Sequence, residues 1–249
     1  MKQASVRKIS IILFALGALI AFLLAVGTIW AHFEMPFFFN YSYVAVSSKG
    51  QQVSRLSCPV ILTNADSGQV SVDIPNTTDK TINIHFQGEI SSMDGTVREV
   101  EFRPAIPVAQ TGRIQFAIDR NDVVFGNLIL VRTYQFSTYK TPARAGSCAV
   151  LMFPISFLSG AELLILTILV SILLILSGIV LWVGNNRPMR GLPRSALTVM
   201  VSLSILLLLA NVVGIAGWWI PGILILVVSI LLAVVSIGYG QDSPSNDRF

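Results

Sequence analysis

The chain has 249 residues, of which 53% are hydrophobic and only 12% carry a charged side chain, and its mean hydropathy is +0.72. Since soluble domains carry about 25% charged residues, this composition excludes an ordinary soluble domain and indicates a membrane protein. The formal net charge of +4 does not indicate nucleic-acid binding, because the basic excess lies beside apolar segments, where membrane orientation explains it.

Four long apolar segments divide the chain, at about Ile9–Trp30, Leu163–Val183, Leu197–Ala216 and Ile220–Ile237. Each approaches the roughly 20 residues that a helix needs to cross a membrane. We therefore predict a membrane bundle of four transmembrane helices with an all-β domain between the first two. The expected order is a tip and first helix (1–31), a β domain (32–157), a second helix (158–184), a basic loop (185–195), a hairpin of two helices (196–238) and a tail (239–249).

The first apolar segment has features of both a membrane anchor and a signal peptide, because basic residues precede it. Its roughly 22 apolar residues exceed the 7–15 of a signal peptide. The bulky sequence Thr28-Ile29-Trp30 is also a poor cleavage site. We expect an uncleaved helix with Trp30 at the outer interface, where amphipathic rings settle.

Residues 32–157 show the alternation of apolar and polar residues expected for half-buried strands. It is clearest in Val70–Ile74, Ile82–Phe86, Val100–Phe102 and Ile114–Ile118. Turn residues such as Asp94-Gly95 separate these runs. About seven or eight short strands predict an antiparallel, immunoglobulin-like β-sandwich, with a small barrel as the alternative.

The chain has two cysteines, Cys58 and Cys148, and both lie in this β segment. An oxidising compartment allows such a pair to form a disulfide, which is our expectation; two buried thiols are the alternative. The Asn-x-Ser/Thr triplets at Asn40 and Asn76 occur at about the frequency expected by chance, so we do not predict glycosylation.

Tryptophans mark the expected membrane interfaces. Trp182 ends the second apolar segment, whereas Trp218 and Trp219 lie in the short turn between the third and the fourth. With Trp30, these residues are the predicted interface anchors. The short turn requires the third and fourth helices to be antiparallel neighbours.

The distribution of charge predicts the orientation, since Lys and Arg accumulate on the cytoplasmic side of inserted helices. Residues 32–157 contain ten basic and ten acidic side chains and are therefore balanced. We predict a multi-pass plasma-membrane protein with both termini in the cytoplasm and residues 32–157 outside. The residues that determine this topology are Lys2, Arg7, Lys8, Arg187, Arg190 and Arg194.

Polar residues are scarce within the apolar segments, which argues against a proton or ion pathway. Asn211 is expected to form a hydrogen bond with a neighbouring helix, and Glu162 is expected to lie at headgroup depth. Small residues on the first two segments allow close helix contact, either within one bundle or between copies; they are Gly17, Ala21, Ser171 and Gly178.

No catalytic, cofactor-binding or metal-binding pattern occurs in the sequence. Glu99 and Glu101 lie on one face of a strand, but the neighbouring arginines make a solvated charged surface the better interpretation. The layout of four spans with an outer β segment resembles the claudin-like four-span proteins. The tryptophan and cysteine signature of that family is absent, so no residue role is transferred.

We therefore expect a non-enzymatic membrane protein whose outer domain binds or positions a partner protein, or which self-associates, with membrane lipids around its helices and no nucleic-acid partner. One alternative is a transporter or channel component for an apolar or lipid-like substrate, which helices interrupted at Gly178 or Gly214 would favour. Another is a membrane-surface enzyme using His32 and Glu162.

Overall fold

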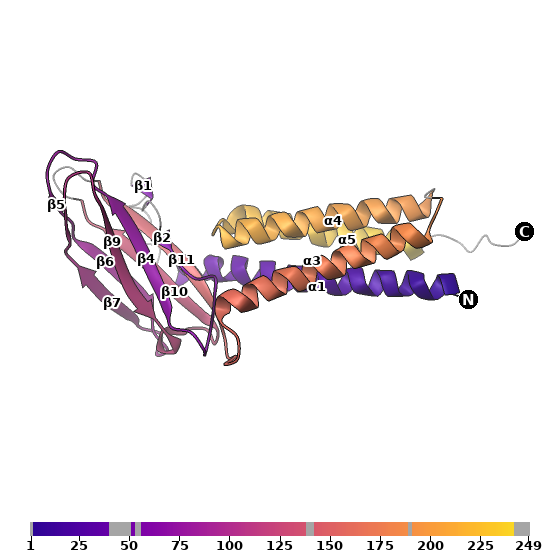
Figure 1. Ribbon diagram of the computed structural model, residues 1–249, viewed down its shortest axis with the longest axis horizontal. Coiled ribbons are helices and arrows are strands. Elements are labelled where there is room, and N and C mark those ends of the chain that lie inside the picture. Colours follow the sequence, from indigo (N-terminus) through magenta and orange to yellow (C-terminus); the bar gives the residue numbers. More distant parts are fainter. Residues whose placement is uncertain (1, 40–50, 53–55, 138–141, 189–190, 242–249) are drawn as a thin grey trace, which may run out of the picture. The chain divides into compact units, whose positions relative to one another are not determined.

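The structure, a computed structural model, describes all residues except 1, 40–50, 53–55, 138–141, 189–190 and 242–249 (Figure 1). It divides into a helical unit, Met1–Ile29 with Ile165–Phe249, and a β unit, Trp30–Leu164. Helices α1 (Lys2–Phe38) and α3 (Gly160–Asn185) each contribute to both units. The last turns of α1 and the first turn of α3 therefore belong to the β domain.

The described residues of the β unit form three sheets. The largest has the order β1-β11-β10-β6-β7, with β3 also paired to β11; the second is β2-β4-β9 and the third β5-β8. The strands are β1 (Gln51–Gln52), β2 (Leu56–Ser57), β3 (Ile61–Thr63), β4 (Gly68–Pro75), β5 (Ile82–Asn83), β6 (Phe86–Ser91), β7 (Val97–Phe102), β8 (Ala105–Ile106), β9 (Thr111–Ile118), β10 (Leu128–Gln135) and β11 (Arg144–Phe153), with a short 3-10 helix η2 (Arg120–Asp122) before β10.

The two larger sheets pack through one hydrophobic core. In β4 and β9 every second residue is buried, as the alternation in the sequence predicts. These side chains meet those of the larger sheet, including Phe86, Ile90, Val131 and Val150. The predicted β domain is thus present.

Two details of the predicted strands are wrong. The largest sheet is mixed rather than purely antiparallel, because β1 and β3 both pair parallel to β11. The single strand expected over Ile82–Phe86 is two strands, since β5 pairs with β8 whereas β6 enters the largest sheet. The amide of Ile84 bonds the carbonyl of Pro104 at the change of sheet.

The helical unit is built from long apolar helices. Three of them, Ser5–Phe38, Gly160–Asn185 and Pro193–Ile215, are long and apolar enough to cross a membrane. Helix α4 spans Leu192–Ile215 and α5 spans Trp219–Gln241, of which Trp219–Val235 is a shorter apolar stretch. Gly217 joins α4 to α5 with a φ of 78°, a conformation that favours glycine, so the expected tight hairpin is present.

Small residues bring α1 and α3 together, as predicted. The Ser10 hydroxyl donates to the Gly178 carbonyl at 2.7 Å, and the Ser171 hydroxyl donates to the Gly17 carbonyl at 2.9 Å. A Cβ added to Gly17 would lie 2.8 Å from the Ser171 carbonyl oxygen. Of the two interpretations, the structure shows packing within one chain.

The predicted interhelical bond of Asn211 is also present. Its side-chain amide on α4 donates to the Ala21 carbonyl of α1 at 3.0 Å and to the Leu207 carbonyl at 2.8 Å. A buried amide in an apolar bundle needs such partners, because an unbonded one is costly.

Candidate functional site

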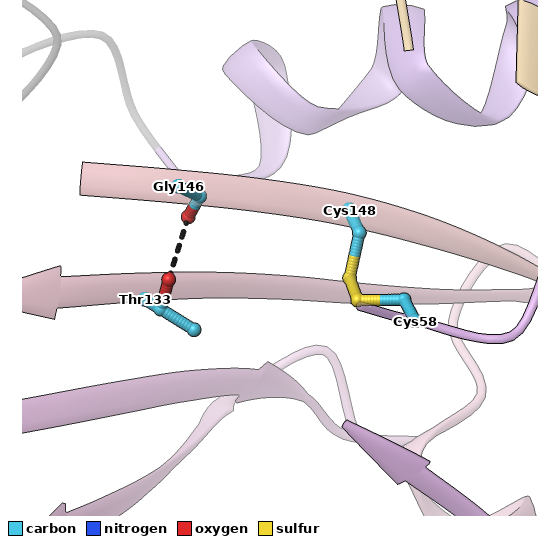
Figure 2. The surroundings of a disulfide bond; sticks show 4 residues. All are labelled: Cys58, Thr133, Gly146 and Cys148. Atoms are coloured by element: carbon cyan, nitrogen blue, oxygen red, sulfur yellow. Dashed lines mark hydrogen bonds between the residues drawn. A yellow bond between two sulfur atoms is a disulfide. The ribbon is translucent and has the colours of Figure 1, made fainter. Parts of the chain in front are cut away.

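The disulfide joins the beginning of the β domain to its last strand. Cys58 and Cys148 are bonded, with their Cα atoms 6.4 Å apart and 90 positions apart in the sequence. Figure 2 shows the bond beside the Thr133 hydroxyl, which donates to the Gly146 carbonyl between β10 and β11 at 3.2 Å. The predicted pairing is confirmed, and it indicates an extracytoplasmic segment.

The first junction of the β domain is with the end of α1, and comprises Phe38, Phe39, Glu89, Phe125 and Arg132. The Arg132 guanidinium donates to the Phe39 carbonyl at 3.2 Å and to the Glu89 carboxylate at 2.8 Å. It also lies 4.8 Å from the Phe39 ring centroid. A cation at a helix C-terminus satisfies carbonyls that have no partner in the helix and opposes its negative end.

Aromatic contacts complete this first junction. The rings of Phe38 and Phe125 meet edge to face, with centroids 6.0 Å apart, and Phe38 also meets Phe39. Phe37 is exposed instead. Of the three consecutive phenylalanines Phe37–Phe39, two rings therefore pack against the β domain.

The second junction is with the start of α3, and comprises Thr63, Asp66, Leu158, Ser159, Gly160 and Glu162. The Asp66 carboxylate accepts the amide N–H of Gly160, the first residue of α3. The Thr63 hydroxyl donates to the Leu158 carbonyl at 2.7 Å. A carboxylate at a helix N-terminus bonds an unpaired N–H and faces the positive end of the helix dipole.

A capping box stabilises the same helix start. The Ser159 amide donates to the Glu162 carboxylate at 2.9 Å, and the Glu162 amide donates to the Ser159 hydroxyl at 3.3 Å. Gly160 allows the chain to pass close to β3, because a Cβ there would lie 2.0 Å from the Ile61 carbonyl oxygen. Glu162 thus has a structural role at this helix start.

A shallow depression of about 350 Å³ lies beside the second junction. It is lined by Thr63, Asn64, Asp66, Asp119, Arg120, Asn121 and Met152. The Asp66 carboxylate accepts the Gly160 amide, and the Asp119 carboxylate accepts the Asn121 amide at 2.7 Å. Among the described residues, no three His, Cys, Asp or Glu side chains are grouped to hold a metal ion.

Glu99 and Glu101 have different environments. Glu101 bonds His85, whose ring stacks on Phe136 with centroids 4.4 Å apart, and Arg103 lies 3.4 Å from the same carboxylate. The hydrogen bond from His85 is the main cause that lowers the pKa of Glu101 below its usual value. Glu99 is exposed, so the strand has the solvated charged surface that the sequence favours.

Several residues predicted to determine the topology lie near one end of the helical unit. The Arg7 guanidinium is 4.9 Å from the centroid of the Trp182 ring, and the Trp182 indole N–H donates to the Pro193 carbonyl at 3.0 Å. The starts of α1 and α4 thus meet the end of α3. Lys8, Arg187 and Arg194 are exposed; for Lys2 only the backbone is described, and Arg190 lies outside the described residues.

The four predicted interface tryptophans differ in exposure. Trp30 and Trp218 are 54% and 64% exposed, as an interface anchor requires. Trp219 is half-buried and packs near Ile29 and Leu226. Trp182 is only 2% exposed, so its position depends on contacts between helices rather than on lipid.

Asn76 is also buried, and its side-chain amide donates to the carbonyls of Lys80, Ile106 and Pro107 at 2.9–3.0 Å. The amide nitrogen that a glycan would occupy is thus used within the fold. Asn40 lies outside the described residues.

Sequence reasoning missed Asp66, Arg132 and Glu89. Arg132 and Glu89 are 43 positions apart in the sequence. The bonds from Arg132 to Phe39 and from Gly160 to Asp66 span 93 and 94 positions, so no local pattern marks these residues. The Ser159-x-x-Glu162 spacing was the one readable signal, since it is the pattern of a capping box.

No protein-family model and no curated protein matches the chain. Solved structures with a similar part include a Paenibacillus cycloisomaltooligosaccharide glucanotransferase, 15% identical over 41% of this chain and 14% of that chain, with a TM-score of 0.32. A Pseudomonas fluorescens alkylpurine DNA glycosylase is 10% identical over 45% and 33%, with a TM-score of 0.30. A CARDB domain from Pyrococcus furiosus is 7% identical over 39% and 90%, with a TM-score of 0.29. Likenesses this slight assign no activity or ligand.

Proposed function

We propose that this chain is a four-span plasma-membrane protein whose outer, immunoglobulin-like β domain binds or positions a partner protein without catalysis. Both termini lie in the cytoplasm and residues 32–157 lie outside. The observation that carries this proposal is the pair of junctions, since Arg132 and Asp66 fix both chain ends of the domain to its body. A domain so fixed is suited to presenting a surface.

Two observations support the orientation. The disulfide Cys58–Cys148 needs an oxidising compartment for the β domain. The Arg7–Trp182 contact and the Trp182–Pro193 bond gather the starts of α1 and α4 at one end of the helical unit. Arg194 follows directly, so basic side chains concentrate at the end that the distribution of charge assigns to the cytoplasm.

The two rival functions have less support. Helices α3 and α4 run without interruption through Gly178 and Gly214, so the discontinuity that favours a transporter is missing at both positions. The proposed enzyme needs Glu162 as a reactive group, but this carboxylate accepts the Ser159 amide in a capping box. Neither rival rests on a specific structural feature.

The orientation is tested by labelling intact, mildly reduced cells with a membrane-impermeant thiol reagent. We expect labelling of Cys58 and Cys148 from outside. The control is Ser195→Cys in a Cys58→Ser/Cys148→Ser background, which should react only after the cells are opened. The opposite pattern would invert the topology and remove the basis of the proposal.

The binding role is tested by treating intact cells with an impermeant amine-reactive crosslinker, which can reach the exposed Lys80. We expect one defined crosslinked species, containing a second protein or a second copy of this chain. The Cys58→Ser/Cys148→Ser variant, with a destabilised domain, should lose it. If the wild-type protein stays monomeric in native membranes, the proposal fails.

A further inference from the structure

Four connecting segments meet at the end of the β domain where α3 begins (Figure 1). The turn between β6 and β7 is joined to η2 by the bond from the Met93 amide to the Asn121 carbonyl, 2.9 Å long. The segment before β10 is joined to the end of β11 by the bond from the Met152 amide to the Asn127 carbonyl. The Asn64 amide, after β3, bonds the Ile155 carbonyl.

Exposed apolar side chains concentrate at this end. Of the large apolar residues that are exposed in the described part of 56–159, only Val108 lies near the other end, in the turn before β9. Phe157 is 80% exposed, Met93 62% and Phe125 57%. We name as the apolar rim the exposed residues Met93, Val97, Phe125, Phe153 and Phe157.

Acidic side chains between the rim residues are bonded within the domain. The Asp94 carboxylate accepts the Thr96 amide at 3.0 Å and the Thr96 hydroxyl at 2.7 Å. Asp122 is buried and pairs with Arg98 at 2.8 Å. Asp66 accepts the Gly160 amide. These carboxylates therefore have their bonding partners within the domain, so they do not require the rim to remain in bulk water.

We propose that the apolar rim enters the outer headgroup layer of the membrane and holds this end of the β domain against lipid. The inference rests on the proposed membrane insertion, and lipid is the expected contact because the rim is continuous with two apolar helices. Phe157 lies three residues before Gly160, where the apolar helix α3 begins. Phe125 contacts Phe38 in the last turn of α1.

The chemistry of the rim fits an interfacial site. Aromatic and methionine side chains gain from leaving water at the boundary between headgroups and acyl chains. Polar neighbours such as Asn64, Arg120 and Asn121 are exposed and can stay hydrated at headgroup level.

The test is photo-crosslinking of the full chain in phosphatidylcholine nanodiscs. The photoreactive amino acid benzoylphenylalanine is incorporated, in separate samples, at Phe157, Phe125, Val108 and Leu166, and adducts are identified by mass. Leu166 is exposed on α3 and reports membrane insertion, whereas Val108 is the matched exposed position at the other end. We expect lipid adducts at Phe157 and Phe125 at least five times as abundant as at Val108.

The outcomes separate the two proposals. Lipid adducts at Leu166 but not at Phe157 or Phe125 would overturn the lipid rim and leave membrane insertion intact. Adducts to a second protein chain at the rim would also overturn it. Equal lipid labelling at Val108 would show no preference for this end, which contradicts the inference. No lipid adduct at Leu166 would overturn the proposed insertion together with the rim.

Discussion

Gly160→Ala probes the second junction, where α3 begins against β3. A Cβ at this position would lie 2.0 Å from the Ile61 carbonyl oxygen, 2.6 Å from the Ile61 carbonyl carbon and 3.0 Å from the Leu62 Cα. All three are main-chain atoms, so no side-chain rotation relieves the clash. The start of α3 must move away from β3 instead.

The expected cost follows from three contributions. In an open helix, Gly→Ala stabilises by about 1 kcal/mol. Overpacking at a close contact costs about 1–3 kcal/mol, and weakening the bond between the Asp66 carboxylate and the Gly160 amide costs about 1.5–3 kcal/mol. The free energy of unfolding of the β domain should therefore fall by about 1.5–5 kcal/mol, opposite in sign to the effect of helix propensity.

The assay is urea unfolding of the detergent-solubilised full chain, with the folded β domain measured by pulse proteolysis. With a denaturant slope of about 2 kcal/mol/M, the midpoint for Gly160→Ala should fall by about 0.8–2.5 M. Gly184→Ala is the control, since Gly184 lies in the same helix and a Cβ there meets nothing within 4 Å. If both variants keep the wild-type midpoint, the packing of α3 on β3 is refuted.

Four other predictions follow from named contacts. Cys58→Ser/Cys148→Ser should cost about 2–5 kcal/mol, seen as a lower urea midpoint for the β domain; an unchanged midpoint would mean that the bond does not form. Arg132→Met should cost about 1.5–3 kcal/mol in the same assay, because it leaves the Glu89 carboxylate without its charged donor. Asn211→Leu should lower the stability of the helical unit by about 0.6–2 kcal/mol, measured by detergent-induced unfolding. Because the folded-state pKa of Glu101 lies below its usual 4.5, its stabilisation is present above pH 4.5 and is lost as the pH falls through the lowered value; Glu101→Gln should remove that part of the acid sensitivity, and an unchanged acid profile would count against it.

The sequence predicted the apolar helices and the disulfide because their signals are local or compositional. The expected segment Leu163–Val183 lies within α3, Gly160–Asn185, since about 20 apolar residues form a helix whatever the surrounding fold. No other disulfide pairing than Cys58 with Cys148 is possible, because the chain has two cysteines only. Alternation likewise identified β4 and β9, which are buried on one face.

The end of α1 was not predictable in the same way. The first domain was expected to end at residue 31, but the helix continues to Phe38 and includes Pro36. The tilted rings of Phe33 and Phe37, with centroids 5.0 Å apart, stabilise these last turns locally. Just after these turns, the Phe39 carbonyl accepts a hydrogen bond from Arg132, 93 positions away in the sequence. A local sequence pattern does not reveal such a contact.

Asp66 and Arg132 each resemble ordinary residues in their local sequence. Asp66 belongs to the turn Asp66-Ser67-Gly68, and Arg132 is a polar residue among the apolar residues of β10. Their roles depend on which helix end the fold brings beside them. The sequence of β10 shows no alternation of apolar and polar residues, because Leu128–Val131 are all buried. The burial of this strand on both faces was therefore not predictable from periodicity.

The two junctions follow one physical rule. A helix that emerges from an apolar environment exposes amide groups at its N-terminus and carbonyl groups at its C-terminus that lack helical partners. The β domain supplies the complementary charge at each end, an anion for the N-terminus of α3 and a cation for the C-terminus of α1. Because each charge also belongs to a packed strand or turn, the helix ends become part of the folded domain. The domain is therefore held to both helix ends by bonded contacts, as the proposed role of positioning a partner would require.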